Sequence, residues 1–203
     1  DAAGAMDYIN SHSTLKECHV ALLPFCVTGQ ATLKANSLYP EKFKNVKAWV
    51  VTNLFTFKTM FLENPLFHTF FMKGGGSLQY ICKETIEEAL RVKHEGYIAK
   101  GTIQQDPNIE FTSEQLCATT YAPDVKVPVL YCTPIDDLNA GQSTDAPQIF
   151  ASFPNTSSEF HPIGCNQLEP FRTTTNNRSQ GYNFYQGESG SKVMLTFLHK
   201  HGL

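Results

Sequence analysis

The sequence has few charged residues and lacks both a dense basic cluster and a long uninterrupted apolar run. Charged residues make up 17% of the 203 residues, and the formal net charge is −3. A nucleic-acid binder needs a concentrated basic face, which this composition does not indicate. The most apolar stretch is interrupted by Lys58, Glu63 and Pro65. It therefore falls short of the roughly 20 apolar residues of a membrane-spanning helix.

The common catalytic and phosphate-binding motifs are also missing. Gly74-Gly75-Gly76-Ser77 lacks the Gly-Lys-Ser/Thr ending whose lysine and hydroxyl meet phosphate and magnesium, so it predicts a turn. No serine lies in a Gly-x-Ser-x-Gly sequence, which excludes the usual form of the serine nucleophile turn.

Metal and cofactor motifs are absent as well. His161 and Cys165 have a spacing that suits two metal ligands, but a closed zinc site needs four and the chain offers no second close pair. Asp136, Asp137 and Asp145 match no EF-hand spacing and predict an acidic surface turn. We therefore expect neither a metal nor a cofactor.

Six cysteines are present: Cys18, Cys26, Cys82, Cys117, Cys132 and Cys165. An even number permits disulfides, but a chain of this length can bury a core without them. Cys26 and Cys132 follow apolar residues, which favours buried free thiols.

The stretch Val46–Lys73 dominates the composition, because it holds the single tryptophan, Trp49, and six of the 15 phenylalanines. Aromatic side chains contribute most to cores, so we expect the core to be centred here. The residues from 46 to 62 fit a helical stripe in part and a strand in part. Their β-branched and aromatic composition favours a strand over Ala48–Lys58. An ordinary core is the expected role, and an exposed aromatic surface is the alternative.

The remaining pattern is rich in strands and poor in helices. Thr85-Ile86-Glu87-Glu88 forms a capping box, which predicts a helix over Thr85–Glu95 that ends at Gly96. A second, short helix is expected to start near Thr112. Further strands are predicted at Glu17–Thr28, Ala31–Asn36, Leu78–Lys83, Tyr97–Gln104, Val125–Thr133, Pro147–Ser152, Tyr182–Gln186 and Lys192–His199.

These strands follow one another without regular helical crossovers, which is typical of antiparallel pairing. The predicted fold is therefore mainly β (β-rich α+β), an antiparallel sandwich or jelly-roll-like barrel with one or two short helices. Residues 1–7 contain Gly4-Ala5-Met6 and look like the remnant of an expression tag, while residues 8–203 are expected to form a single globular domain.

The leading functional prediction is a non-catalytic structural or interaction domain, either a coat-type assembling subunit or a partner-binding module. The passage Val129–Asp137 is loosely similar to strand-to-acidic-turn passages in small-virus coat proteins. Protein partners or self-assembly would use the irregular segment Phe153–Gln180, since a loop this long is usually functional. The candidate binding residues are Phe55, Phe57, Phe67, Phe70, Arg172 and Arg178.

Two alternatives stay open. The first is a Cys/His-dependent hydrolase, for which Cys18, His161 and Cys165 are the candidate residues. His19 is not expected to activate Cys18, because adjacent residues of a strand point to opposite faces, so a more distant histidine would be needed. The second is a barrel that binds an apolar ligand among its phenylalanines.

Overall fold

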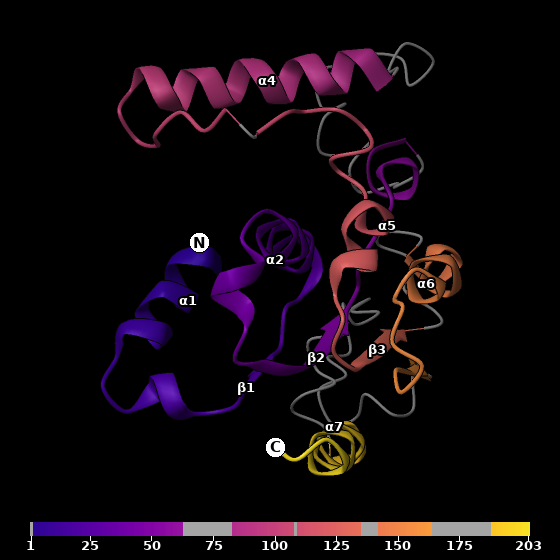
Figure 1. Ribbon diagram of the computed structural model, residues 1–203. Helices are drawn as coiled ribbons and strands as arrows, with labels where there is room; N and C mark the ends of the chain where they lie inside the picture. The colour runs from indigo at the N-terminus through magenta and orange to yellow at the C-terminus, as the bar shows by residue number, and fades with distance from the viewer. Residues whose placement is uncertain (1, 63–82, 108, 135–141, 164–187) are drawn as a thin grey trace.

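The computed structural model describes residues 2–62, 83–107, 109–134, 142–163 and 188–203 (Figure 1). Four strands form one sheet: β1 (Val20–Leu22), β2 (Val46–Thr52), β3 (Val129–Pro134) and β4 (Glu159–Ile163). Their order in space is their order in the sequence, and every neighbouring pair is parallel.

The prediction of an antiparallel sandwich or jelly-roll-like barrel is therefore wrong. Parallel neighbours need a crossover after each strand, and helices supply these crossovers here. The sheet is an open α/β sheet with helical cover on both faces, which is the usual setting of parallel strands. The alternative of a ligand-binding barrel is wrong for the same reason.

Helices fill the connections and both ends of the described chain (Figure 1). They are α1 (Ala2–Ser11), α2 (Cys26–Leu38), α4 (Lys83–Ala99), α5 (Ala118–Tyr121), α6 (Gln142–Ala151) and α7 (Glu188–Lys200). Short helical turns occur at η1 (Leu15–Glu17), η2 (Pro40–Phe43), η3 (Lys58–Leu62) and η5 (Ala122–Asp124).

Two apolar clusters hold α1, α2, α5, α6 and α7 to the two faces of the sheet. The larger cluster joins side chains of α1, α2, α5 and α6 to Trp49, Val51 and Tyr131. The smaller cluster lies on the opposite face, where Phe197 of α7 packs against Val50 and Leu130. Among the described crossover helices, α2, α5 and α6 therefore pack on one face, and α7 covers the other.

The prediction that the Trp49 region is the centre of the core is confirmed. β2 is a strand from Val46 to Thr52, and Trp49 is 1% exposed. The predicted strand extended to Lys58, but the strand ends earlier, where Asn53 takes a left-handed backbone conformation with φ 55°. Beyond it, Phe55 and Phe57 remain buried.

Several segments predicted as strands are helices. Ala31–Asn36 and the last residues of Glu17–Thr28 belong to α2, which starts at Cys26. Pro147–Ser152 overlaps α6, which contains Pro147, and Lys192–His199 lies in α7. These short apolar runs fit either periodicity, and packing against the sheet decides the helical form.

The helix predicted from the capping box is confirmed, since α4 covers Thr85–Glu95. It runs past Gly96 to Ala99, so the predicted strand Tyr97–Gln104 is wrong. The left-handed residue that follows the helix is Gly101, with φ 67°. The Leu78–Lys83 strand, apart from Lys83 at the start of α4, and Tyr182–Gln186 lie outside the described residues.

The first residues of the chain take part in the packing. Met6 of α1 is 1% exposed within the larger cluster, and Asp7 forms an ion pair with Lys42 at 2.6 Å. Their origin in an expression tag stays a prediction. None of the helices in the described part of the chain has the length and apolar character that a bilayer crossing requires.

Candidate active site

The turn from β1 into α2 holds one of the two non-glycine residues of the described chain that have a left-handed backbone. Cys26, the first residue of α2, has φ 50°. Apart from glycines, only Asn53 shares this left-handed conformation among the described residues. Such a conformation costs an L-residue about 1–2 kcal/mol, and retained strain of this kind clusters at functional sites.

Neighbouring contacts hold this turn in place. The carbonyl of Pro24 accepts the N–H of Thr52 at 3.4 Å, which ties the chain before Cys26 to β2. Thr28 Oγ1 accepts the N–H of Phe25 at 3.2 Å and donates to its carbonyl at 2.5 Å. The N–H of Gly29 then makes the first helical bond, to the Phe25 carbonyl, at 3.1 Å. These bonds hold Cys26 between the carboxyl end of β2 and the first turn of α2.

The position of Cys26 suits a nucleophile. Parallel α/β sheets bind ligands beyond the carboxyl ends of their strands, and Cys26 follows the carboxyl end of β1. The thiol is half-buried and is not in a disulfide. The N–H groups of the first helical turn, including that of Val27, have no acceptor within the helix and give this end a partial positive charge. Helix N-termini favour the thiolate form of cysteine.

A close approach between α2 and the end of β2 completes the site. A Cβ atom on Gly29 would lie 2.5 Å from Leu54 Cδ2, so only glycine fits there without a shift. Leu54 is fully buried and follows Asn53 directly. The strand–turn–helix with a strained nucleophile position and a nearby glycine is the arrangement of a nucleophile elbow, with cysteine where serine is more common.

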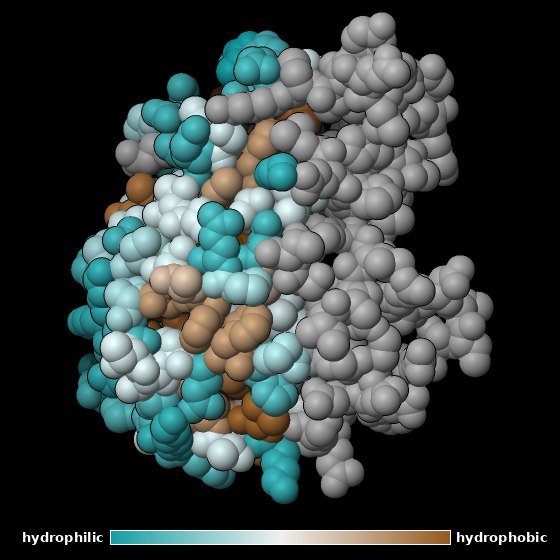
Figure 2. Space-filling view, turned by 90° about the vertical axis from the view of Figure 1, so that its right-hand side faces the viewer, coloured by the Kyte–Doolittle hydropathy of each residue, from teal (hydrophilic) through white to brown (hydrophobic). Residues whose placement is uncertain are grey.

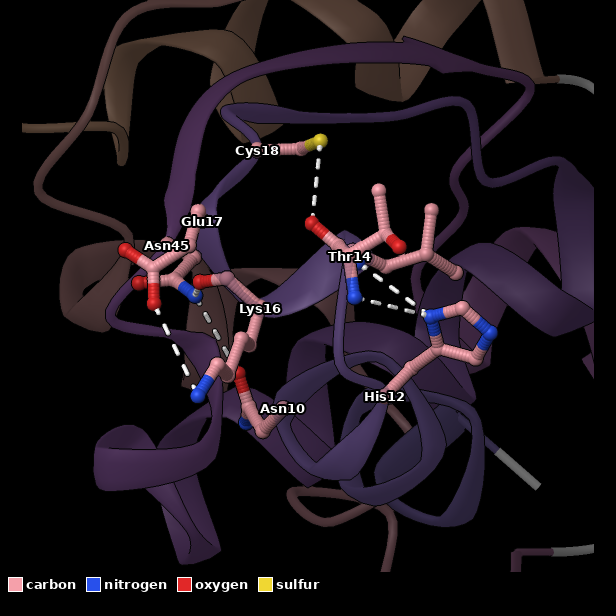
Figure 3. Close-up of polar contacts among 8 residues, drawn as sticks. Asn10, His12, Thr14, Lys16, Glu17, Cys18 and Asn45 are labelled. Atoms are coloured by element: carbon pink, nitrogen blue, oxygen red, sulfur yellow. Dashed lines mark hydrogen bonds and ion pairs between the residues drawn. The ribbon is translucent and has the colours of Figure 1, made fainter.

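The predicted candidate Cys18 lies at the other end of β1 (Figure 3). Its thiol is exposed and contacts the Thr14 carbonyl at 3.7 Å. The imidazole of His12 is engaged by the backbone of the same loop, where its Nδ1 accepts the N–H groups of Thr14 and Leu15 at 3.2 and 3.3 Å. The structure shows no base on Cys18 among the described residues.

His161 lies on β4, where it pairs in register with Cys132 of β3. Cys26 follows β1, three strand spacings away, or about 14 Å at roughly 4.8 Å per spacing. His161 therefore cannot take a proton from Cys26 directly. Cys132 is buried as predicted, and burial raises the pKa of its thiol, which keeps it protonated.

The other predicted residues are placed as follows. Phe55 and Phe57 are 3% and 4% exposed, on the segment that follows β2. Asp145 is 9% exposed, and its carboxylate accepts the N–H of Thr56 at 2.9 Å and the hydroxyl of Thr59, so it holds that segment to α6. Cys165, Phe67, Phe70, Arg172, Arg178, Asp136 and Asp137 lie outside the described residues.

The sequence reasoning missed Cys26, which it treated as a buried thiol. The available signal was the run Val20-Ala21-Leu22-Leu23, followed after two residues by Cys26 and, three residues later, by Gly29. A search limited to serine between two glycines could not find it. Within the described ranges, no group of three or more His, Cys, Asp or Glu side chains is placed to hold a metal ion.

The exposed large apolar side chains of the described residues are distributed over several elements. The face in Figure 2 shows apolar patches near its middle, with polar side chains around them. The exposed apolar residues of the described chain include Tyr8 on α1, Val92 on α4 and Leu195 on α7. Beside the candidate nucleophile, Leu23 and Val27 are 43% and 57% exposed.

Comparison with known proteins gives likenesses in structure but none in sequence. No family model and no curated protein sequence matches the chain. Among solved structures, the chain is similar to a bromoperoxidase from Bacillus anthracis, with a TM-score of 0.45 and 15% identity. The likeness covers 91% of this chain and 69% of that one. At this level it says nothing about the chemistry of this chain.

The predicted role as a non-catalytic coat-type subunit or partner-binding module is wrong. It depended on a strand-rich antiparallel fold, and the sheet of the described chain is parallel instead. The similarity of Val129–Asp137 to strands of coat proteins no longer supports that role, because β3 is a parallel strand inside the sheet.

Proposed function

We propose that this chain is a hydrolase that uses Cys26 as the nucleophile of an acyl-transfer reaction. The left-handed backbone of Cys26 at the junction of β1 and α2 carries the proposal. The fold maintains this conformation through the hydrogen bonds of Thr28 and Pro24 and through the close packing of Gly29 against Leu54. Strain that several neighbours maintain at a strand end is the mark of a preorganised reactive group.

In the first half-reaction, the Cys26 thiolate attacks the carbonyl carbon of an ester. A carbon–sulfur bond forms, and negative charge develops on the carbonyl oxygen. The N–H of Val27, the residue after the nucleophile, is the donor that an elbow provides to this oxygen. The carbon–oxygen bond to the leaving alkoxide then breaks, and the alkoxide takes a proton from water.

In the second half-reaction, water attacks the acyl-thioester carbonyl. The carbon–sulfur bond breaks and the carboxylic acid leaves. The second proton of the attacking water combines with the hydroxide left when water protonated the alkoxide, so Cys26 returns to its thiolate form. This scheme needs no histidine beside the sulfur in the resting enzyme, because the helix N-terminus favours the thiolate. It replaces the expected Cys/His pair, since His161 is too far from Cys26 to act as its base.

Hydrolysis of p-nitrophenyl acetate by purified Cys26→Ala and Cys18→Ala variants tests the proposal. Cys18 is the matched control because it is a more exposed thiol at the opposite end of the same strand. Loss of the nucleophile should lower the rate at least about a hundredfold, whereas Cys18→Ala should stay within about twofold of the unmodified chain. Equal rates for all three proteins would contradict the proposal.

Two partner expectations stay predictions. One is that a protein or a second copy of the chain binds, and the other is that nucleic acid does not. Of the basic residues Lys42, Lys44 and Lys47, Lys42 is engaged by Asp7. Asp7 neutralises one of the three charges, which supports the expectation that this group of lysines is not a phosphate-binding face.

A further inference from the structure

We propose that Asn53 is a positioning residue for Cys26, because its left-handed backbone seats Leu54 under the first turn of α2. This rests on the proposed role of Cys26 as nucleophile. Asn53 contacts no substrate in this proposal, and its effect is transmitted through Leu54 and Gly29.

The two left-handed residues occupy equivalent places on neighbouring strands. Phe25 and Thr52 form a parallel bridge, and the residues that follow them are Cys26 and Asn53. Their φ angles are 50° and 55°. The two segments therefore leave the sheet at paired positions and with the same left-handed turn. The first continues into α2, and the second continues into the buried segment that starts at Leu54.

The turn at Asn53 decides where Leu54 goes. Leu54 is fully buried, and its Cδ2 occupies the space that a Cβ atom on Gly29 would need. Leucine and helix backbone are thus in direct contact one turn after Cys26. A displacement of Leu54 would change the distance between α2 and the sheet, and the Cys26 thiol would move with the helix.

Polar bonds hold the segment after Leu54 to the same helix. Gln30 Nε2 donates to the Phe55 carbonyl at 3.0 Å and to the Leu116 carbonyl at 2.9 Å. The Phe55 carbonyl also accepts the N–H of Ala118 at 3.3 Å. Residues 53–55 therefore connect β2 to both α2 and α5, and the conformation of Asn53 sets the start of this connection.

Asparagine suits the position because it tolerates the left-handed region better than most residues with a side chain, and glycine tolerates it best. If the backbone carries the effect, glycine should replace Asn53 without loss and alanine should not. This contrast separates the backbone role from any role of the carboxamide.

The test is the rate at which iodoacetamide alkylates Cys26 between pH 5 and 9 (roughly the range in which thiolates form), followed by peptide mass mapping. Asn53→Gly should react within about twofold of the unmodified chain. Asn53→Ala should react about tenfold more slowly at neutral pH, with its profile displaced to higher pH. In ester hydrolysis, kcat should fall and KM should stay constant, because the substrate contacts are unchanged.

Two results would overturn the proposal: an unchanged rate in Asn53→Ala, or an equal loss in Asn53→Gly. Alkylation of Cys18 in the same samples is the internal control, and circular dichroism checks the fold. If Asn53→Ala does not fold, Gly29→Ala carries the test, since its Cβ must push Leu54 aside. Gly29→Ala should slow alkylation of Cys26 and added Leu54→Ala should restore it; no slowing would contradict the proposal.

Failure of the hydrolase proposal is distinguishable from failure of this one. Alkylation requires only a thiolate and no substrate. An unmodified chain that hydrolyses no ester, but whose Cys26 alkylation depends on Asn53 as described, would contradict the hydrolase and support the positioning role.

Discussion

The two ends of β1 carry one cysteine each, and they differ in almost every respect. Cys18 precedes the strand in extended backbone with φ −83° and ψ 146°, and its thiol is exposed. Cys26 follows the strand with φ 50° and is half-buried at the start of a helix of 13 residues. The more accessible thiol has no strain and no helix N-terminus beside it.

Under the proposed function, the less exposed of the two cysteines is the reactive one, so exposure alone would not identify it. A thiolate needs neighbouring positive charge or donors to form at neutral pH. In a parallel sheet these groups gather at the carboxyl ends of the strands, where the helices begin. The amino end of β1 lacks them, because the short helix before it, η1, ends there.

The largest expected effect on stability comes from the different backbone strain at Cys26 and at Cys18. Cys26→Gly should be more stable than Cys26→Val by about 2 kcal/mol, because glycine accepts a positive φ and a β-branched residue does not. The same pair of substitutions at Cys18 should reverse the order or show no difference, since an extended φ suits valine. Urea denaturation of the four variants measures this, and equal stabilities at Cys26 would argue against stored strain.

A smaller effect is expected from the bonds that support the carboxyl-end turn. Thr28→Val removes the hydroxyl that bonds both the N–H and the carbonyl of Phe25. The free energy of unfolding should fall by about 1 kcal/mol, and Cys26 should be alkylated more slowly. Thermal unfolding and mass mapping report the two results. Full retention of both would mean that the turn needs no support from Thr28.

The matching change at the amino end should be smaller still. His12→Ala removes the imidazole that accepts the N–H groups of Thr14 and Leu15. Because water can replace it at this exposed turn, the loss should be about 0.5 kcal/mol. Alkylation of Cys26 should not change, and a slowing there would show that the two ends are coupled.

The smallest signal is expected from Cys132 inside the sheet. Burial raises the pKa of its thiol, so it should stay unmodified by a thiol reagent at neutral pH in the folded chain. Its modification should appear only when urea unfolds the protein. Rapid labelling under native conditions would contradict the packing between β3 and α7.

Part of this fold could be predicted from sequence. The aromatic and β-branched composition around Trp49 indicated β2, and the Thr85 capping box indicated α4. The parallel topology could not be read, because α2 contains Val27, Thr28, Gly29 and Thr32, which are poor helix formers, and its helical form depends on packing against the sheet. Likewise, Pro147 inside α6 argued against a helix that tertiary contacts nevertheless stabilise.

The candidate site was harder to predict than the core. Nothing in the residue type of Cys26 reveals a φ of 50°, because that angle arises where α2 must leave β1 and approach Leu54. The pairing of Phe25 with Thr52, which brings Cys26 beside Asn53, depends on the parallel register. The antiparallel pairing predicted from the sequence does not bring Cys26 beside Asn53.

The most direct test is to trap the acyl group on the protein. The chain is exposed briefly to p-nitrophenyl acetate, quenched with acid and digested, and the mass of each cysteine peptide is measured. The account predicts an acetyl group on the peptide that contains Cys26 and none on the peptide that contains Cys18. Acetylation of Cys18 alone, or of neither cysteine while ester hydrolysis proceeds, would contradict it.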